Sequence, residues 1–356
     1  MLSKPARESI ESWTRRFYDE GVLAIPHAYQ QVELVRSDLA GFLGASPDGL
    51  GFFTATSGAL SQVALSLPLK PDDEILIWDQ EYPSNHYPWR VAAERAGAKL
   101  VIASSGPNLE TNSKELFKHV TPRTRVVAFS WVQFRTGAIT DIKAVTEFAQ
   151  DRGIFTCADI IQGAGVLPFH FAESGLDAAC GGSHKWMCSV PSVGYLCLKP
   201  DHIEHFPPRA VGANSFGTSE DPVRADAQPR STALRFEPGS LPLLDILALG
   251  ASVRLLRETQ ISRISQEAEW LARKLMHGLR EHGYLINSPH GAHFRGAIVN
   301  FTPGPDARYQ TLDEVSARLR DERVGHVKRP PGLRLSCHAY NTPEEVDRLL
   351  EILAGR

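Results

Sequence analysis

A carboxylate and a lysine stand at the ends of two short apolar runs in the middle of the sequence. Asp159 follows IFTCA (154–158), and Lys185 comes shortly after AACG (178–181). The carboxyl ends of parallel strands share one edge of a sheet, where ligands bind, so we expect both side chains at that edge. A lysine whose surroundings lower its pKa can form a Schiff base with a carbonyl compound. The sequence therefore predicts a site for amine chemistry, with a helix cap as the structural alternative for Asp159.

The elements that must position these two residues are short apolar runs separated by amphipathic stretches. Continuous apolar strands spaced by helices are typical of a mostly parallel sheet that is buried on both faces. We predict strands at residues 74–78, 99–103, 125–131, 154–158, 178–181 and 193–198, with helices such as 85–96 and 142–152 between them. The fold class is thus α/β.

The last third of the chain has a different pattern. Residues 201–233 are rich in proline, glycine and serine and predict a long loop, and residues 243–282 predict helix. Thr342, Pro343 and Glu345 form a capping-box pattern for a final helix. We therefore predict a large domain at 1–245 and a smaller α+β domain at 246–356, with strands at 284–287 and 297–301 and helices at 312–323 and 343–353.

Composition narrows the function classes. The chain has 356 residues, of which 42% are hydrophobic and 22% charged, with a formal net charge of −3. This balance argues against a nucleic-acid partner, which would need a basic face. The longest apolar run, 241–251, is interrupted by Asp245 and is far shorter than the roughly 20 residues that span a bilayer. Five cysteines without a CxxC pair, and an N-terminus without an apolar signal segment, lead us to expect a cytoplasmic protein without a membrane partner.

Four motifs occur in order along the chain. They are D-x-x-Q at 159–162, the pair Leu176-Asp177, G-S-H-K at 182–185, and RLSCHAYNTPEEVDRLL at 334–350. In this order and at these separations, the sequence resembles the fold-type I enzymes that use pyridoxal phosphate (PLP). The branch it resembles is that of class V aminotransferases and cysteine desulfurases, including the proteins similar to isopenicillin N epimerase.

The resemblance implies a PLP-dependent transferase fold like that of aspartate aminotransferase, and it implies roles for the central motifs. Lys185 would hold PLP as an internal aldimine and move protons at the substrate Cα. Asp159 would pair with the pyridinium nitrogen and keep the ring an electron sink. Gln162 would reach the phenolic oxygen of the ring, and Ile161 would lie against one ring face.

The resemblance also implies a phosphate site at a strand-to-helix turn. FFTATSGA (52–59) is a strand, a turn of small residues and the start of a helix, and helix N-termini bind phosphate. Ser57 and Gly58 occupy the two central positions of this turn, and Ser183 and His184 would add donors from the other side. Gly239-Ser240 matches a turn that the family contributes across a dimer, which implies a homodimer with shared active sites.

Further residues match positions that face the cofactor or the substrate. Tyr82 stands where many relatives place a stacking histidine, although a core tyrosine is the alternative. Gln133 falls near a polar position of the family, whereas we expect the adjacent Arg135 to be solvated. Arg334 matches the arginine that binds the substrate α-carboxylate, with an ordinary surface ion pair as its alternative.

Three departures from the family pattern bear on the reaction. Residues 323–334 contain no cysteine, where desulfurases of this branch carry a catalytic one, and we expect Cys337 to be a packed thiol. After the lysine, only Pro191 and Gly194 of a glycine-rich turn persist. The chain also begins about where the first helix would start, which leads us to expect a more open pocket or another element filling it.

We expect a PLP enzyme acting on a small amino acid, with an aminotransferase first. A C–S lyase acting by β-elimination and an amino-acid epimerase are the alternatives, and a PLP-binding dimer with little turnover is the alternative of another class. A nicotinamide dehydrogenase on a similar sheet lacks its glycine fingerprint here. We predict no metal site, since His202 and His205 have no evident third ligand and are expected to be a surface pair.

Overall fold

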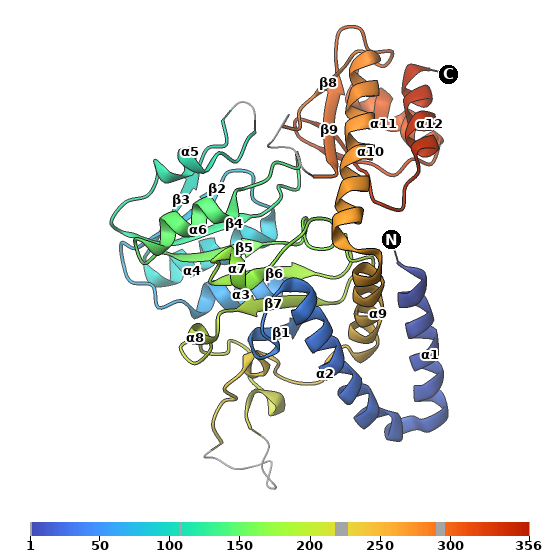
Figure 1. The fold of residues 1–356 in the computed structure, drawn as a ribbon. Coiled ribbons are helices and arrows are strands. Elements are labelled where there is room, and N and C mark those ends of the chain that lie inside the picture. Colours follow the sequence, from blue (N-terminus) through green and yellow to red (C-terminus); the bar gives the residue numbers. More distant parts are fainter. Residues whose placement is uncertain (1, 107–108, 218–226, 290–295, 356) are drawn as a thin grey trace.

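Two sheets organise the computed structural model, which describes residues 2–106, 109–217, 227–289 and 296–355. Figure 1 shows the larger sheet in the middle of the molecule and the smaller one beside the far end of helix α10. The strands are β1 (Leu50–Phe53), β2 (Glu74–Trp78), β3 (Lys99–Ala103), β4 (Thr124–Ser130), β5 (Phe155–Asp159), β6 (Ala178–Gly182), β7 (Gly194–Leu198), β8 (Tyr284–Ile286), β9 (Ile298–Pro303), β10 (Val327–Arg329) and β11 (Gly332–Ser336). The α-helices are α1 (Lys4–Glu20), α2 (Ala24–Leu43), α3 (Thr56–Ser66), α4 (Tyr87–Ala96), α5 (Ser113–Phe117), α6 (Ile142–Gln150), α7 (Phe171–Ser174), α8 (Pro200–Ile203), α9 (Leu243–Thr259), α10 (Ile261–Glu281), α11 (Leu312–Asp321) and α12 (Pro343–Ala354).

The large sheet is mostly parallel, which confirms the predicted fold class. Its strand order is β1-β7-β6-β5-β4-β2-β3, and the neighbours from β6 through to β3 run parallel. Strands β7 and β1 are added antiparallel at one side. The predicted strands at 74–78 and 99–103 have the bounds of β2 and β3, and the other predicted strands of this sheet differ from the structure by at most one residue at either end.

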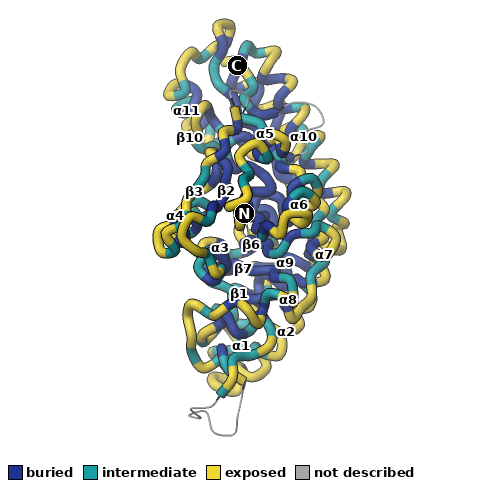
Figure 2. The backbone as a smooth tube through the Cα atoms, turned by 90° about the vertical axis from the view of Figure 1, so that its left-hand side faces the viewer, coloured by how far each residue is buried: buried dark blue, intermediate teal, exposed yellow. Residues whose placement is uncertain are grey.

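Alternating side chains of the strands pack against helices on opposite faces of the sheet. On β2, Ile75 and Ile77 join the core that contains α3 and α4, whereas Leu76 and Trp78 join the core that contains α2, α6 and α9. The alternation follows from the two-residue repeat of a strand. Figure 2 shows the buried backbone concentrated in the sheet, with exposed segments around it.

The long helical stretch is two helices rather than one. The helical segment predicted at 243–282 is interrupted at Gln260, which has φ +66°. Helix α9 packs against α1 and α2. Along α10, Ile264 and Ala268 belong to the large core, and residues from Leu271 onward belong to the core of the small sheet. The division at residue 245 stays a prediction.

The small sheet is antiparallel, with the order β10-β11-β9-β8, and α10, α11 and α12 contribute to its core. The predicted capping box is confirmed, since Thr342 accepts from the Glu345 N–H at 3.3 Å and Glu345 accepts from the Thr342 N–H at 3.0 Å. The predicted loop at 201–233 contains the end of the short helix α8, and its residues 218–226 lie outside the described residues.

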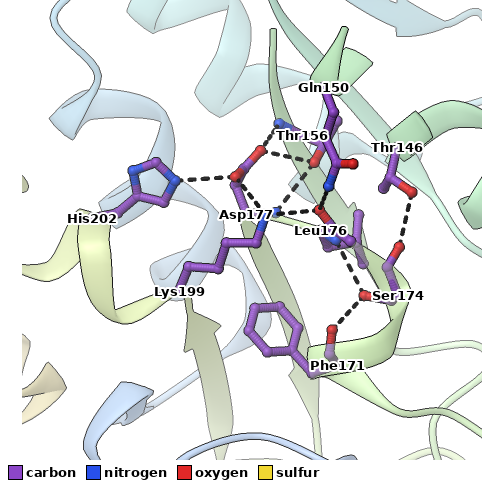
Figure 3. A network of polar contacts seen from close by, with 10 residues as sticks. Thr146, Gln150, Thr156, Phe171, Ser174, Leu176, Asp177, Lys199 and His202 are labelled. Atoms are coloured by element: carbon purple, nitrogen blue, oxygen red, sulfur yellow. Dashed lines mark hydrogen bonds and ion pairs between the residues drawn. The ribbon is translucent and has the colours of Figure 1, made fainter. Parts of the chain in front are cut away.

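A polar network ties together the edge of the large sheet where its parallel strands begin. Asp177, just before β6, accepts from the Thr156 N–H at 2.8 Å and from Lys199 Nζ at 3.0 Å, and lies 3.1 Å from His202 Nε2 (Figure 3). His202 is therefore engaged by a carboxylate. In the described ranges, no three His, Cys, Asp or Glu side chains are grouped to hold a metal ion. No helix among the described residues has the length and apolar character to cross a bilayer.

Candidate active site

The predicted site residues come from several strand ends at one edge of the large sheet. Ser130 ends β4 and pairs with Asp159, which ends β5, and Gly182 ends β6 three residues before Lys185. Gly194 at the start of β7 pairs with both Gly182 and Phe53. The end of β1, and with it the start of α3, therefore reaches the same edge.

Asp159 is buried and has few partners. The residue is 3% exposed, and among the described residues its carboxylate accepts one hydrogen bond, from the Ile161 N–H at 3.0 Å. Burial raises the pKa of Asp159, against the opposing effects of that hydrogen bond and of the positive charge of Lys185. Residues 160–163 form a turn and not a helix, so the helix-cap alternative is wrong. A buried carboxylate with one hydrogen bond needs a cationic or donating partner.

Lys185 lies in the loop after β6. Its Nζ is 5.6 Å from the centre of the Tyr82 ring. Burial lowers the pKa of Lys185 to about 8, with the charge of Asp159 opposing this shift and the charges of Arg334 and Arg329 adding to it. At pH 7 about one amine in ten is then neutral, compared with fewer than about one in a thousand for an ordinary lysine.

Hydrogen bonds within the chain fix the lysine loop. The Ser183 N–H donates to the Val193 carbonyl at 3.0 Å, and the Ser183 hydroxyl donates to the carbonyls of Val190 and Val193. The hydroxyl of Ser183 is thus engaged by the main chain, and this geometry adds no support for its predicted role at the phosphate. His184 is exposed, and its phosphate role stays a prediction.

The turn at the start of α3 presents free donors. The N–H groups of Gly58 and Ala59 donate to the Ala55 carbonyl, whereas those of Thr56 and Ser57 have no partner among the described residues. The hydroxyl of Thr56 is buried without a partner, and the Ser57 hydroxyl lies 2.7 Å from that of Ser84. Such a helix N-terminus suits an anion.

Two glycines let the turn approach the sheet. A Cβ added to Gly194 would lie 2.2 Å from the carbonyl carbon of Ala55, and one added to Gly182 would lie 2.7 Å from Thr56 Oγ1. The turn therefore packs directly on β6 and β7. Gly58 and Ser240 of the same chain line one hollow of about 340 Å³, and the predicted use of Ser240 across a dimer stays a prediction.

Gln162 is held by a residue that the sequence reasoning did not single out. Its Oε1 accepts from the indole N–H of Trp186 at 3.2 Å, and Gln162 is 7% exposed. Its amide nitrogen has no partner among the described residues, so it can donate to a ligand, as predicted for the phenolic oxygen. Trp186 in turn stacks on His338, with ring centres 5.0 Å apart.

A buried acidic residue next to Tyr82 was also missed. Glu81 accepts from the Ser130 N–H at 2.8 Å, from Asn85 at 2.8 Å and from Gln133 at 2.9 Å, as well as from the Ser130 hydroxyl. Burial raises the pKa of Glu81 to about 7 despite these hydrogen bonds. Glu81 fixes Gln133, whose Oε1 is buried without a partner. The sequence signal that could have identified Glu81 is its position three residues after the end of β2.

Arg334 approaches from the small sheet. Its Nη1 donates to the Phe134 carbonyl at 2.7 Å, and its Nε is buried without a partner. The ring of Phe134 packs edge-on to that of Tyr82, with centres 5.0 Å apart. Burial lowers the pKa of Arg334, and the charge of Arg329 lowers it further, against an opposing effect of Tyr82. No carboxylate in the described part of the chain pairs with Arg334, so the surface ion pair is not found, and the guanidinium is available to a carboxylate ligand.

These features fit the group that the resemblance implies. PLP carries a ring nitrogen, a phosphate, a phenolic oxygen and an aldehyde. Asp159, the α3 turn and the Gln162 amide offer matching groups to the first three, and Lys185 offers an amine of lowered pKa to the last. The donor set therefore fits PLP, although the assignment of each residue stays a proposal.

Comparisons with known proteins agree with this fit. The family model described as "Aminotransferase class-V" matches residues 20–349. The chain is 24% identical over 355 residues to the uncharacterized aminotransferase YcbU of Bacillus subtilis, covering 100% of this chain and 91% of that protein. It is 30% identical over 334 residues to isopenicillin N epimerase of Streptomyces clavuligerus, covering 89% of this chain and 82% of that protein.

A solved structure gives the same fold. The apo structure of a cysteine desulfurase from Thermococcus onnurineus NA1 superposes with a TM-score of 0.90 at 22% identity, covering 100% of this chain and 93% of that one. The architecture is thus that of fold-type I enzymes. Because the family model matches residues 20–349 of the 356 residues, the chain belongs to the class V aminotransferase family of PLP-dependent enzymes.

Proposed function

We propose that the protein is an aminotransferase that takes a small amino acid through Arg334 and uses Lys185 as its proton carrier. One observation carries the proposal. An amine with a pKa of about 8 is subject to the opposing charges of a buried carboxylate, Asp159, and of Arg334, a guanidinium without a carboxylate partner among the described residues. This is the charge arrangement that a cofactor with a cationic ring and an anionic substrate require.

When bound, PLP supplies an electron sink that stabilises negative charge at the substrate Cα. Asp159, desolvated by its burial, would hold the proton on the ring nitrogen. The N–H groups at the start of α3, with Ser57 and Gly58, would hold the phosphate, and Tyr82 would cover a ring face. Gln162 would donate to the phenolic oxygen while Trp186 keeps its amide oriented.

Lys185 would move the proton. In its neutral form the amine can take a proton from the substrate Cα, and in its charged form it can deliver one to C4′ of the cofactor. A pKa of about 8 makes both forms accessible near neutral pH. Arg334 would orient the substrate through its α-carboxylate, so that the Cα proton faces the amine.

An amino-acid epimerase is one alternative to the aminotransferase, because a relative named isopenicillin N epimerase is 30% identical to this chain. A two-base epimerisation requires a second proton donor on the opposite face of Cα from Lys185.

A persulfide-forming desulfurase is disfavoured by the thiols. All five cysteines are buried, and burial raises the pKa of Cys337 to about 12. A nucleophilic thiolate requires the opposite environment. A C–S lyase, which needs no protein thiol, stays an alternative, and so does a PLP-binding dimer with little turnover. The proposal includes a homodimer in which the Gly239–Ser240 turn of one chain completes the site of the other.

Absorbance of the purified protein supplied with PLP, and then with single amino acids, tests the proposal. We expect a Schiff-base band in the parent protein, and after hydride reduction and denaturation the reduced cofactor should stay attached to the parent protein but not to Lys185→Ala. One amino acid should convert the band to a pyridoxamine-like spectrum and release its keto acid. Pyruvate and sulfide from cysteine would establish the lyase instead, and loss of optical activity without keto acid would establish the epimerase. No chromophore with added PLP would overturn the catalytic proposal.

A further inference from the structure

Three arginines gather around Phe134, next to the candidate site. The guanidinium carbon of Arg135 lies 5.5 Å from the centre of the Phe134 ring, and that of Arg329 lies 5.9 Å from it. Arg334 donates to the carbonyl of the same residue at 2.7 Å. Arg135 was expected to be a solvated side chain, and Arg329 was not singled out by the sequence.

The described residues supply no ion pair to this cluster. Among the described residues, no carboxylate forms an ion pair with Arg135, Arg329 or Arg334. The Nε atoms of Arg329 and Arg334 are buried and lack a partner. The buried Arg36, by contrast, donates to Glu237 at 2.6 Å and to Glu33 at 2.9 Å. Neighbouring guanidinium groups repel one another, so an anion placed between them would be stabilised.

The strand register places two of these arginines on one face of the small sheet. Arg334 pairs with Val327, and Arg329 is two residues further along β10. Directly paired residues share a face, and residues two apart along a strand do so as well. Arg329 and Arg334 therefore project from the same face.

A buried asparagine fixes the third arginine relative to this face. Asn300 on β9 pairs with Arg334 and is fully buried. Its Nδ2 donates to the Arg135 carbonyl at 3.0 Å and to the Arg329 carbonyl at 2.9 Å. The large-sheet loop with Arg135 is thereby tied to the strand with Arg329, so the cluster is a fixed feature of the junction between the two sheets.

The cluster is close to the reacting centre. The Phe134 ring contacts the Tyr82 ring, and Lys185 Nζ lies 5.6 Å from the centre of the Tyr82 ring. The charges of Arg334 and Arg329 are both felt at the Lys185 amine. A substrate that places its Cα next to Lys185 and its α-carboxylate on Arg334 would extend its side chain into the region of the other two arginines.

We propose that Arg329 and Arg135 bind a second anionic group, carried by the substrate side chain, so that the substrate class is amino acids with an acidic side chain. The inference rests on the proposed function, because it takes Arg334 as the site of the α-carboxylate. Carboxylate and phosphate share the chemistry that a guanidinium recognises in a bidentate manner.

Paired ligands test the proposal with the PLP-loaded protein. Spectral titration compares aspartate with asparagine, glutamate with glutamine, and phosphoserine with serine. We expect the acidic member of at least one pair to bind at least about 10-fold more tightly than its neutral member. Which pair shows this preference tells whether the site takes a carboxylate or a phosphate. Arg329→Gln and Arg135→Gln should each weaken that member about 10- to 100-fold, the range for losing a hydrogen bond to a charged group.

Two controls keep the outcomes distinct. The neutral member should be weakened far less than the acidic member in these variants, and Arg320→Gln, which removes an exposed charge from the same region of the chain, should leave both members unchanged. Calorimetry with succinate and with butyrate measures the binding of a second carboxylate without any reaction. If amino acids react but the acidic members show no advantage, this inference is wrong and the proposed function stands. If no amino acid reacts and succinate still binds in preference to butyrate, with Arg329→Gln abolishing the preference, the proposed function fails and the anion site stands.

Discussion

Two carboxylates at opposite edges of the large sheet, the half-buried Asp177 and the buried Asp159, have opposite surroundings. Asp177 lies beside the start of β5, where burial is outweighed by hydrogen bonds from His202, Thr156 and Lys199, so that its pKa is lowered (Figure 3). Asp159 lies at the end of β5, has one hydrogen bond, and has a pKa raised by burial. The chain satisfies the first charge itself and leaves the second for a ligand. The difference separates a carboxylate that the chain pairs itself from one that we propose serves the site.

The largest expected effect follows from removing the amine of Lys185, which lies at the same edge of the sheet as Asp159. We expect Lys185→Ala to lower the rate of reaction with amino acids by at least about 10²–10⁴-fold, the range for losing a general acid–base group. The free energy of unfolding should not fall, because the amine is desolvated and makes no hydrogen bond in the described structure. Single-turnover rates and thermal unfolding measure the two quantities. A variant that unfolds without losing activity per folded molecule would contradict the assignment.

The second prediction neutralises each of the two carboxylates separately, in a matched pair of variants. Asp159→Asn should lower activity by about 10²–10³-fold, as the loss of one preorganised electrostatic group does, with the free energy of unfolding unchanged or higher. Asp177→Asn should lower the free energy of unfolding by about 2–3 kcal/mol, the scale of hydrogen bonds to a charged group. Its activity at a temperature where it stays folded should be near that of the parent protein.

Chemical denaturation and steady-state rates on both variants provide the measurement. The comparison between the edges is lost if Asp159→Asn destabilises the protein as much as Asp177→Asn does. It is sharpened if adding PLP raises the stability of the parent protein and of Asp177→Asn, but raises that of Asp159→Asn much less.

The same contrast explains how much of the molecule could be predicted from the sequence. The strands of the large sheet, and the positions of Asp159 and Lys185 at or after their ends, could be predicted because strand patterning and local motifs carry them. Arg329 and Asn300 could not, because their roles arise from the register of β9, β10 and β11 and from contact with a loop of the other sheet. Glu81 was missed since two of its partners, Ser130 and Gln133, lie on β4 and in the loop that follows it.

The break between α9 and α10 illustrates the same limit. The apolar spacing continues through residue 260, so it predicts one helix, whereas the backbone of Gln260 turns at φ +66°. Each of the two helices packs against different elements, α9 against α1 and α2 and α10 against β8 and α12. Tertiary packing on both sides thus decides the break, and no local residue pattern encodes it.

The third prediction uses pH on the cofactor-free protein. Because the pKa of Asp177 is lowered on folding, its stabilising contribution is present above the unfolded value of about 3.9 and is lost as pH falls through the folded pKa. For Asp159 the pKa is raised, so stability decreases as pH rises from about 3.9 through the folded pKa. Asp177→Asn should flatten the acid side of the stability profile, and Asp159→Asn should remove part of the decline above it. Unfolding midpoints in denaturant from pH 3 to pH 8 on the three proteins measure this, and parallel profiles would show that the two environments do not differ.

The smallest expected effect concerns how the charges near Asp159 and Arg334 set the pKa of the Lys185 amine. Only the neutral form of Lys185 can capture PLP, so the rate of cofactor capture should rise with pH to a midpoint near 8. Arg334→Gln removes a positive charge that lowers the pKa of Lys185, and the midpoint should move to higher pH. Arg36→Gln is not a suitable control, because it breaks a buried ion pair, whereas Arg320→Gln removes an exposed charge of the same kind. A midpoint near 8 that Arg334→Gln leaves unmoved would assign the lowered pKa to burial alone, and the arginines of this edge would then act on the substrate and not on the lysine.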